Sequence, residues 1–130
     1  MLIVDFWRNV YNSSINPKTG KGKVNFMLLI KAIVRPEKSS SVIDALYSAG
    51  FPAITRMDVE GRGRQKGEEK GDFFDELPKT LLYIVCNDED KNTIVDIILS
   101  KARTGEHGDG RIFISSVEEA YTISTGEEGL

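Results

Sequence analysis

Two glycine-rich stretches carry the residues whose types and spacing suggest chemistry. The first, GRGRQKG, runs from Gly61 to Gly67, and the second, TGEHGDGR, runs from Thr104 to Arg111. Glycine lets the backbone approach a ligand closely, and cations such as Arg64 and Arg111 attract an anion. The two stretches are therefore candidates for a phosphate site. Each also has a simpler interpretation: a surface hairpin for the first, and a helix C-cap with a tight turn for the second.

Other kinds of chemistry have few residues available. The chain has one cysteine and one histidine, so Cys86 cannot form an internal disulfide or a cysteine-based zinc site. Cys86 ends an apolar run, which indicates a buried side chain, and His107 lies among glycines, which is typical of a solvated turn residue. No serine–histidine or paired-carboxylate arrangement is evident. The sequence predicts a protein that is not an enzyme.

Hydrophobic periodicity predicts the elements that must position these stretches. Alternating residues predict a strand over 28–34, stopped by Pro36, and a helix capped within 39–41 and closed by Gly50. The remaining expected elements are strands over 53–59, 81–85 and 112–114, a helix from the acidic run 88–90 to about residue 103, and a short fifth strand over 120–123. The apolar run 81–85 suits a central strand.

This order of elements, β-α-β-β-α-β, predicts an α+β fold, a ferredoxin-like sandwich. Its four-stranded antiparallel sheet has two helices on one face, which leaves the other face uncovered. Leu29 and Ile33 are out of phase with the core positions and would lie on that open face. Exposed apolar surface is costly, so we expect the chain to self-associate over it.

The charge divides the chain into two regions. Residues 1–26 hold four basic residues against Asp5, whereas the whole chain has a net charge of −3. We expect 1–26 to be a poorly ordered N-terminal extension and 27–130 to form one domain. Two alternatives remain open: a docking helix carrying Phe6, Trp7 and Val10, or a natural translation start at Met27.

Composition also limits the cellular compartments and the kinds of partner that we expect for this chain. The negative net charge argues against nucleic-acid binding by broad phosphate neutralisation. No apolar run approaches about 18 residues, so we expect no membrane insertion. A single cysteine fits a reducing cytoplasm.

Taken together and in order, several motifs resemble the PII nitrogen regulatory (GlnB-like) family. They are GRGRQKG, Leu77-Pro78-Lys79, TGEHGDGRIF and Thr125-Gly126-Glu127, spread over a correspondence from Met27 to Glu128. The Arg-Pro-Glu-Lys start and the short acidic loop look most like the archaeal branch associated with nitrogenase genes. The resemblance implies a trimer, or a mixed assembly with a paralogous chain, that has nucleotide sites between subunits. It also implies control of a target enzyme, such as nitrogenase, by direct contact.

The resemblance assigns ligands residue by residue. ATP or ADP corresponds to Thr55, Gly61, Gly63, Arg64, Gln65, Val85, Gly108, Gly110 and Arg111. The effector 2-oxoglutarate corresponds to Gln65 and Lys79, and Mg²⁺ accompanying ATP corresponds to Gln65, whose amide oxygen suits a hard cation. Phe73 and Phe74 are the large apolar groups of the loop that would contact the target.

Departures from the family pattern keep other functions open. Thr122 and Ser124 stand where PII proteins commonly have arginines, so a PII-like trimer that has lost nucleotide binding is one alternative. The large loop is shorter than usual and lacks the tyrosine that enteric relatives modify. A second alternative is an acylphosphatase-like enzyme using Arg64 or Arg111 with a polar partner such as Asn87.

Overall fold

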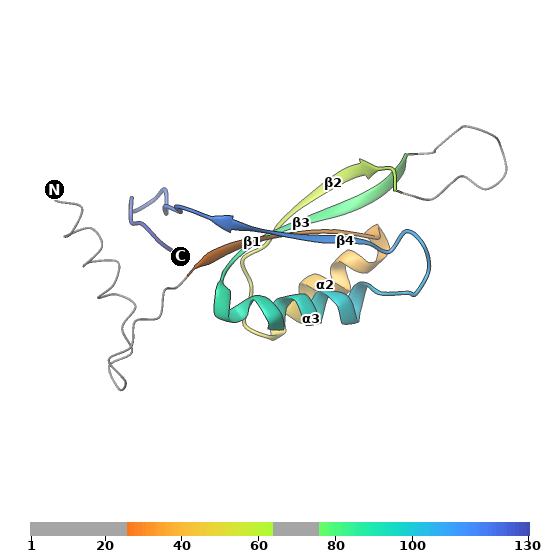
Figure 1. Cartoon of the computed structure of the whole chain (residues 1–130), viewed down its shortest axis with the longest axis horizontal. Coiled ribbons are helices and arrows are strands. Elements are labelled where there is room, and N and C mark those ends of the chain that lie inside the picture. Colours follow the sequence, from red (N-terminus) through yellow and green to blue (C-terminus); the bar gives the residue numbers. More distant parts are fainter. Residues whose placement is uncertain (1–25, 64–75) are drawn as a thin grey trace.

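The described part of the chain folds into a four-stranded antiparallel sheet with two α-helices packed on one face (Figure 1). The computed structural model describes residues 26–63 and 76–130. The elements are β1 (Met27–Val34), α2 (Pro36–Ser48), β2 (Thr55–Gly61), β3 (Leu77–Asn87), the 3₁₀ helix η1 (Asp88–Asp90), α3 (Lys91–Ala102) and β4 (Gly110–Val117). The strand order is β2-β3-β1-β4. This confirms the predicted ferredoxin-like α+β fold, with β3 in an internal position.

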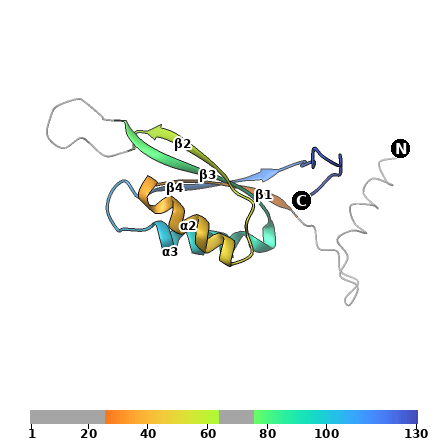
Figure 2. The same cartoon turned by 180° about the vertical axis from the view of Figure 1, so that it is seen from behind.

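The core lies between the sheet and the helices. Side chains alternate across a strand, so every second residue of β1 and β3 points toward the helices. In α2 and α3 the buried residues recur every three or four positions, which places them on one stripe of each helix. The largest fully buried apolar side chains are Ile30, Val34, Val42, Leu46, Leu82, Ile94 and Ile98. Both helices cover the same face of the sheet, as the view from behind also shows (Figure 2).

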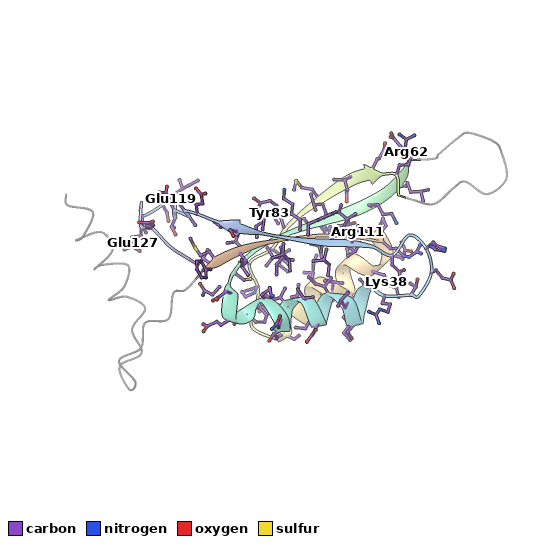
Figure 3. The ribbon with its side chains drawn as sticks, viewed as in Figure 1. Lys38, Arg62, Tyr83, Arg111, Glu119 and Glu127 are labelled. Atoms are coloured by element: carbon purple, nitrogen blue, oxygen red, sulfur yellow. The ribbon has the colours of Figure 1, made fainter. Side chains whose placement is uncertain are left out.

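None of the helices in the described residues, 26–63 and 76–130, covers the opposite face of the sheet. Leu29 pairs with Val85, and Lys31 lies between Tyr83 and Phe113 across β3, β1 and β4. Tyr83 is 37% exposed and Phe113 is 51% exposed. Figure 3 shows Tyr83 on the side of the sheet away from the helices. The predicted open apolar face is therefore present in the isolated chain.

Several element boundaries differ from those expected. The first helix begins at Pro36 rather than after a serine cap at 39–41, because proline suits the first helical position, where no N–H bond is needed. Ser39 is instead buried within the first turn, and its hydroxyl donates to the carbonyl oxygen of Pro36 at 2.8 Å. The strand β3 is longer than expected, since it runs out along the β2–β3 hairpin. The acidic residues 88–90 form η1, and the α-helix proper starts at Lys91.

The expected fifth strand over 120–123 is wrong. The segment after β4 folds back on itself, with one isolated bridge between Tyr121 and Glu128. Thr122 N–H donates to the carbonyl oxygen of Glu127 at 2.8 Å, and Gly126 N–H donates to that of Thr122 at 2.7 Å. Hydrogen bonds within the turn therefore pair these backbone N–H and C=O groups, which do not pair with the sheet. We call residues 118–130 the C-terminal arm; Glu119 and Glu127 on it lie at the end of the molecule opposite Arg62 (Figure 3).

The predicted extension over 1–26 lies outside the described residues except for Phe26, which is 58% exposed. Its state stays a prediction. Neither α2 nor α3, nor any other helix within 26–63 and 76–130, is long and apolar enough to cross a lipid bilayer.

Candidate functional site

The turn between α3 and β4 is built around one carboxylate, that of Asp109. Its Oδ2 accepts hydrogen bonds from the backbone N–H of Thr104 at 2.8 Å and of Gly105 at 2.9 Å. Its Oδ1 accepts from the Thr104 hydroxyl and from Arg35 Nε, the latter at 3.0 Å. The Thr104 hydroxyl bond and these other donors hold the pKa of Asp109 well below its usual range. The carboxylate is therefore ionised at neutral pH and joins the two ends of the turn.

Arg35 ties this turn to the start of α2. It follows β1 directly, and its guanidinium also donates to the carbonyl oxygen of His107 at 2.8 Å. The side chains of Arg35 and Asp109 are 23% and 24% exposed, so the ion pair is partly shielded from water. One arginine thus holds the turn at two points.

Two glycines give the turn its shape. Gly108 and Gly110 have φ of +94° and +106°, a region that other residues rarely adopt. Gly110 opens β4 opposite Val34, and a Cβ there would lie 1.7 Å from the carbonyl oxygen of Ile33. The strand β1 can approach β4 this closely only because position 110 has no side chain.

Lys79 connects the turn to the base of the β2–β3 hairpin. Its ammonium group donates a hydrogen bond to the carbonyl oxygen of Gly108. Burial lowers the pKa of Lys79, and the positive charge of Arg35 lowers it further, while Glu37 and Asp109 oppose the shift. The two glycine-rich stretches, far apart in sequence, therefore meet through one lysine.

A hollow of about 680 Å³ opens where these segments converge. Six residues that the resemblance assigns to ligands line it: Gly61, Gly63, Lys79, Gly108, Gly110 and Arg111. Ile33, Leu77 and Phe113 contribute apolar surface, and Arg62 and His107 complete the lining. None of the lining residues that the structure describes is acidic. A hollow with three cations and an apolar part suits an anion attached to a flat or apolar group.

Some predicted site residues lie elsewhere in the chain. Thr55 and Val85 are on the other part of the sheet, with Thr55 opposite Tyr83, and they do not line the hollow. Arg64, Gln65, Phe73 and Phe74 lie outside the described residues. Their assigned roles, and the Mg²⁺ site at Gln65, stay predictions.

The arm that carries Thr122 and Ser124 starts at the far end of β4. Glu118 follows the eight-residue strand that begins at Gly110, so the two residues are about 26 Å apart at about 3.3 Å per residue. In the isolated chain, neither Thr122 nor Ser124 lines the hollow.

The enzyme alternative that pairs Arg111 with Asn87 does not fit this geometry, and the form that uses Arg64 lies outside the described residues. Arg111 pairs with Ile33, whereas Asn87 pairs with Met27, six residues away along β1 and about 20 Å off. Arg111 and Asn87 therefore cannot act on one phosphate within a chain. Cys86 is buried on the helix face of the sheet, and burial raises the pKa of its thiol. Within 26–63 and 76–130, no three His, Cys, Asp or Glu side chains group as metal ligands.

Sequence reasoning gave no role to Arg35, Thr104 or Asp109. An aspartate between two glycines just after a helix is a usable signal, because its carboxylate can accept the N–H groups that a turn leaves free. Arg35 has no such local signal, since its partner Asp109 is 74 residues away in sequence. Only the adjacency of β1 and β4 brings the two together.

The fold and the hollow define a small ferredoxin-like module with a basic, glycine-lined ligand site. The family model described as "Nitrogen regulatory protein P-II" matches residues 27–127, so the chain belongs to the P-II family. Proteins of this family are regulatory signalling proteins rather than enzymes, which agrees with the expectation from the sequence.

Several similar proteins come from archaea. The chain is 54% identical over 105 residues to "Nitrogen fixation nifHD region GlnB-like protein 1" of Methanothermobacter marburgensis, covering 80% of this chain and 100% of that protein. It is 51% identical, with the same coverage, to the protein of that name from Methanothermococcus thermolithotrophicus. It is 50% identical over 109 residues to "Nitrogen regulatory protein P-II 2" of Methanothermobacter thermautotrophicus, covering 80% of this chain and 95% of that one. These names match the expected nitrogenase-associated branch and support a role in nitrogen regulation.

Proposed function

We propose that this chain is a cytoplasmic nitrogen-regulatory protein that binds ATP or ADP together with 2-oxoglutarate and controls nitrogenase by direct contact. The observation that carries the proposal is the hollow in which Lys79, Arg111 and the Gly108–Gly110 turn converge. The nitrogenase target rests on the nif-region names of the relatives.

The residues of the hollow fit a nucleoside polyphosphate. The left-handed glycines let the backbone come close to phosphate oxygens, and a side chain at position 110 has no space. Arg111 is exposed at the start of β4, where its guanidinium can pair with phosphate oxygens. The apolar surface of Ile33 and Phe113 gives a base or ribose something to pack on.

The second effector, 2-oxoglutarate, fits the environment of Lys79. Its ammonium group lies at the base of the hairpin and already holds one carbonyl oxygen, that of Gly108. A carboxylate of the effector would give this partly buried cation a stronger partner than a carbonyl. Together with the predicted contact to Gln65, the dianion would then favour one conformation of the loop between β2 and β3.

Assembly follows from the open face. We propose a trimer, homomeric or mixed with a paralogous chain, that buries the face carrying Leu29, Tyr83 and Phe113. Thr55 and Val85, which lie away from the hollow of their own chain, would reach nucleotide only where a second subunit brings its hollow beside them. Sedimentation equilibrium that finds a stable monomer at micromolar concentration would contradict this.

Calorimetric titration with ATP tests the site. Replacing Arg111 by alanine removes a charge-assisted contact worth about 1.5–3 kcal/mol, so affinity should fall about 10- to 100-fold. Arg56→Ala is the matched control, because Arg56 is exposed on β2 and does not line the hollow. Unchanged affinity in the Arg111 variant would refute the placement. Absence of ATP binding in the wild-type protein would favour a trimer that has lost nucleotide binding, as Thr122 and Ser124 allow.

Capture of nitrogenase tests the target. The wild-type protein should retain the enzyme and release it when 2-oxoglutarate and Mg-ATP are added together. The double variant Phe73→Ala with Phe74→Ala should lose capture and keep ATP binding. A double variant that still captures and releases the enzyme would show that another surface makes the contact.

A further inference from the structure

The Asp109 carboxylate sits beside the hollow without lining it. All four of its hydrogen-bond donors come from protein groups: two backbone N–H groups, the Thr104 hydroxyl and Arg35. Arg35 also compensates its charge, at 3.0 Å. A negative side chain this close to a phosphate site would repel the ligand if it were unpaired. Here the carboxylate accepts three hydrogen bonds from the turn and one from Arg35.

The turn needs such an anchor because of its composition. Three glycines, Gly105, Gly108 and Gly110, fall within six residues, and glycine loses more conformational freedom on ordering than any other residue. If the turn became ordered only on binding, the entropy lost in ordering it would reduce the affinity for the ligand. The Asp109 bonds tie the turn to the end of α3 and, through Arg35, to the start of α2 before any ligand binds.

We propose that Asp109 is a positioning residue that presets the 104–110 turn for a polyphosphate and makes no contact with the ligand itself. Arg35 holds the turn against the start of α2. Thr104 joins the beginning of the turn to Asp109 through its backbone N–H and its hydroxyl. This inference rests on the proposed function for the identity of the ligand; the ordering of the turn does not depend on it.

Three variants and one control test the proposal. Asp109→Asn keeps the size of the side chain and removes its charge, and Thr104→Val removes only the hydroxyl donor. Thr104→Ser restores that donor and should behave as wild type. Asp44→Asn is the matched control, because Asp44 is an exposed carboxylate on α2 away from the hollow. Far-ultraviolet circular dichroism and thermal melting establish that each variant is folded.

The first measurement uses the protein without nucleotide. ¹⁵N relaxation gives order parameters for the amides of Gly105, Gly108 and Gly110. They should fall in Asp109→Asn, fall less in Thr104→Val, and stay at wild-type values in Thr104→Ser and Asp44→Asn. Unchanged order in a folded Asp109→Asn protein would overturn the proposal.

The second measurement compares two ligands in competition with a fluorescent ATP analogue. Asp109→Asn should weaken ATP by at least about tenfold and leave adenosine unchanged, because only the phosphates use the turn. An equal loss for ATP and adenosine would indicate general damage and overturn the positioning role, as would unchanged ATP binding. If the wild-type protein binds no nucleotide while the order parameters fall as expected, the proposed function is wrong and the ordering role of Asp109 stands.

Discussion

Gly110→Ala should destabilise the protein strongly, because two separate costs meet at this position. The backbone has φ of +106°, and strain of this kind in a residue other than glycine costs about 1–3 kcal/mol. The new Cβ would also lie 1.7 Å from the carbonyl oxygen and 2.7 Å from the carbonyl carbon of Ile33. These are backbone atoms of a central strand, so no flexible side chain can move aside.

A substitution at a second glycine separates the steric cost from the cost of backbone strain. Gly50 has φ of +93°, and a Cβ there would meet nothing within 4 Å. Gly50→Ala therefore carries the strain alone. Relieving the clash at Gly110 requires the start of β4 to move from β1, at about a further 1–3 kcal/mol, which is typical of overpacking. We expect a total of about 2–6 kcal/mol for Gly110→Ala, near the top of the range for single substitutions.

Urea unfolding at equal protein concentration measures the difference, since an assembly makes stability depend on concentration. The free energy of unfolding should fall clearly more for Gly110→Ala than for Gly50→Ala, and the melting temperature should drop by at least about 8 °C. Equal effects of the two substitutions would refute the close approach of β1 and β4 at this glycine.

Three further predictions use other parts of the structure. The folded state lowers the pKa of Asp109, so its charge stabilises the fold above about pH 4. The difference in unfolding free energy between wild type and Asp109→Asn should therefore shrink as the pH falls below that value. Urea unfolding midpoints measured against pH test this, and a difference that grows in acid would contradict it. Burial raises the pKa of the Cys86 thiol, so a thiol reagent should modify the folded protein far more slowly than the denatured one, and equal rates would place Cys86 at the surface. Phe113→Lys should leave the monomer folded and raise the dissociation constant of self-association by at least about tenfold, as measured by sedimentation equilibrium. Tyr47→Lys, on the helix side of the molecule, is the control. An unchanged dissociation constant for Phe113→Lys would show that the open face is not the interface.

The ligand site was predictable only in part. The glycine-rich stretches were found from residue type, because close backbone approach and left-handed φ both require glycine. Gly108 and Gly110 both adopt a left-handed φ in the structure. Gly63 is different: among the described residues, no atom lies within 4 Å of the place that a Cβ would take. Composition alone does not separate a glycine that the backbone requires from one that it merely tolerates.

What the sequence by itself determined is the order of elements and the face that each one buries. Apolar residues recur every two positions in a strand and about every 3.6 positions in a helix. This spacing predicts that Ile30, Ala32 and Val34 face the core and that Leu29 and Ile33 face the open side. Boundaries were less well determined. Pro36 both ends β1 and starts α2, and the serines that follow are equally good caps by type.

Only the tertiary structure decided which distant residues meet. Pairing of β1 with β4 brings Arg35 to Asp109, and pairing of β1 with β3 brings Lys79 to the carbonyl oxygen of Gly108. The same register places Asn87 about 20 Å from Arg111, which excludes the pairing of these two residues at one phosphate within a chain, although residue types alone allowed it. Strand register is set by the burial of whole faces rather than by any local motif, so contacts across 29 or 74 residues follow from the sheet as a unit.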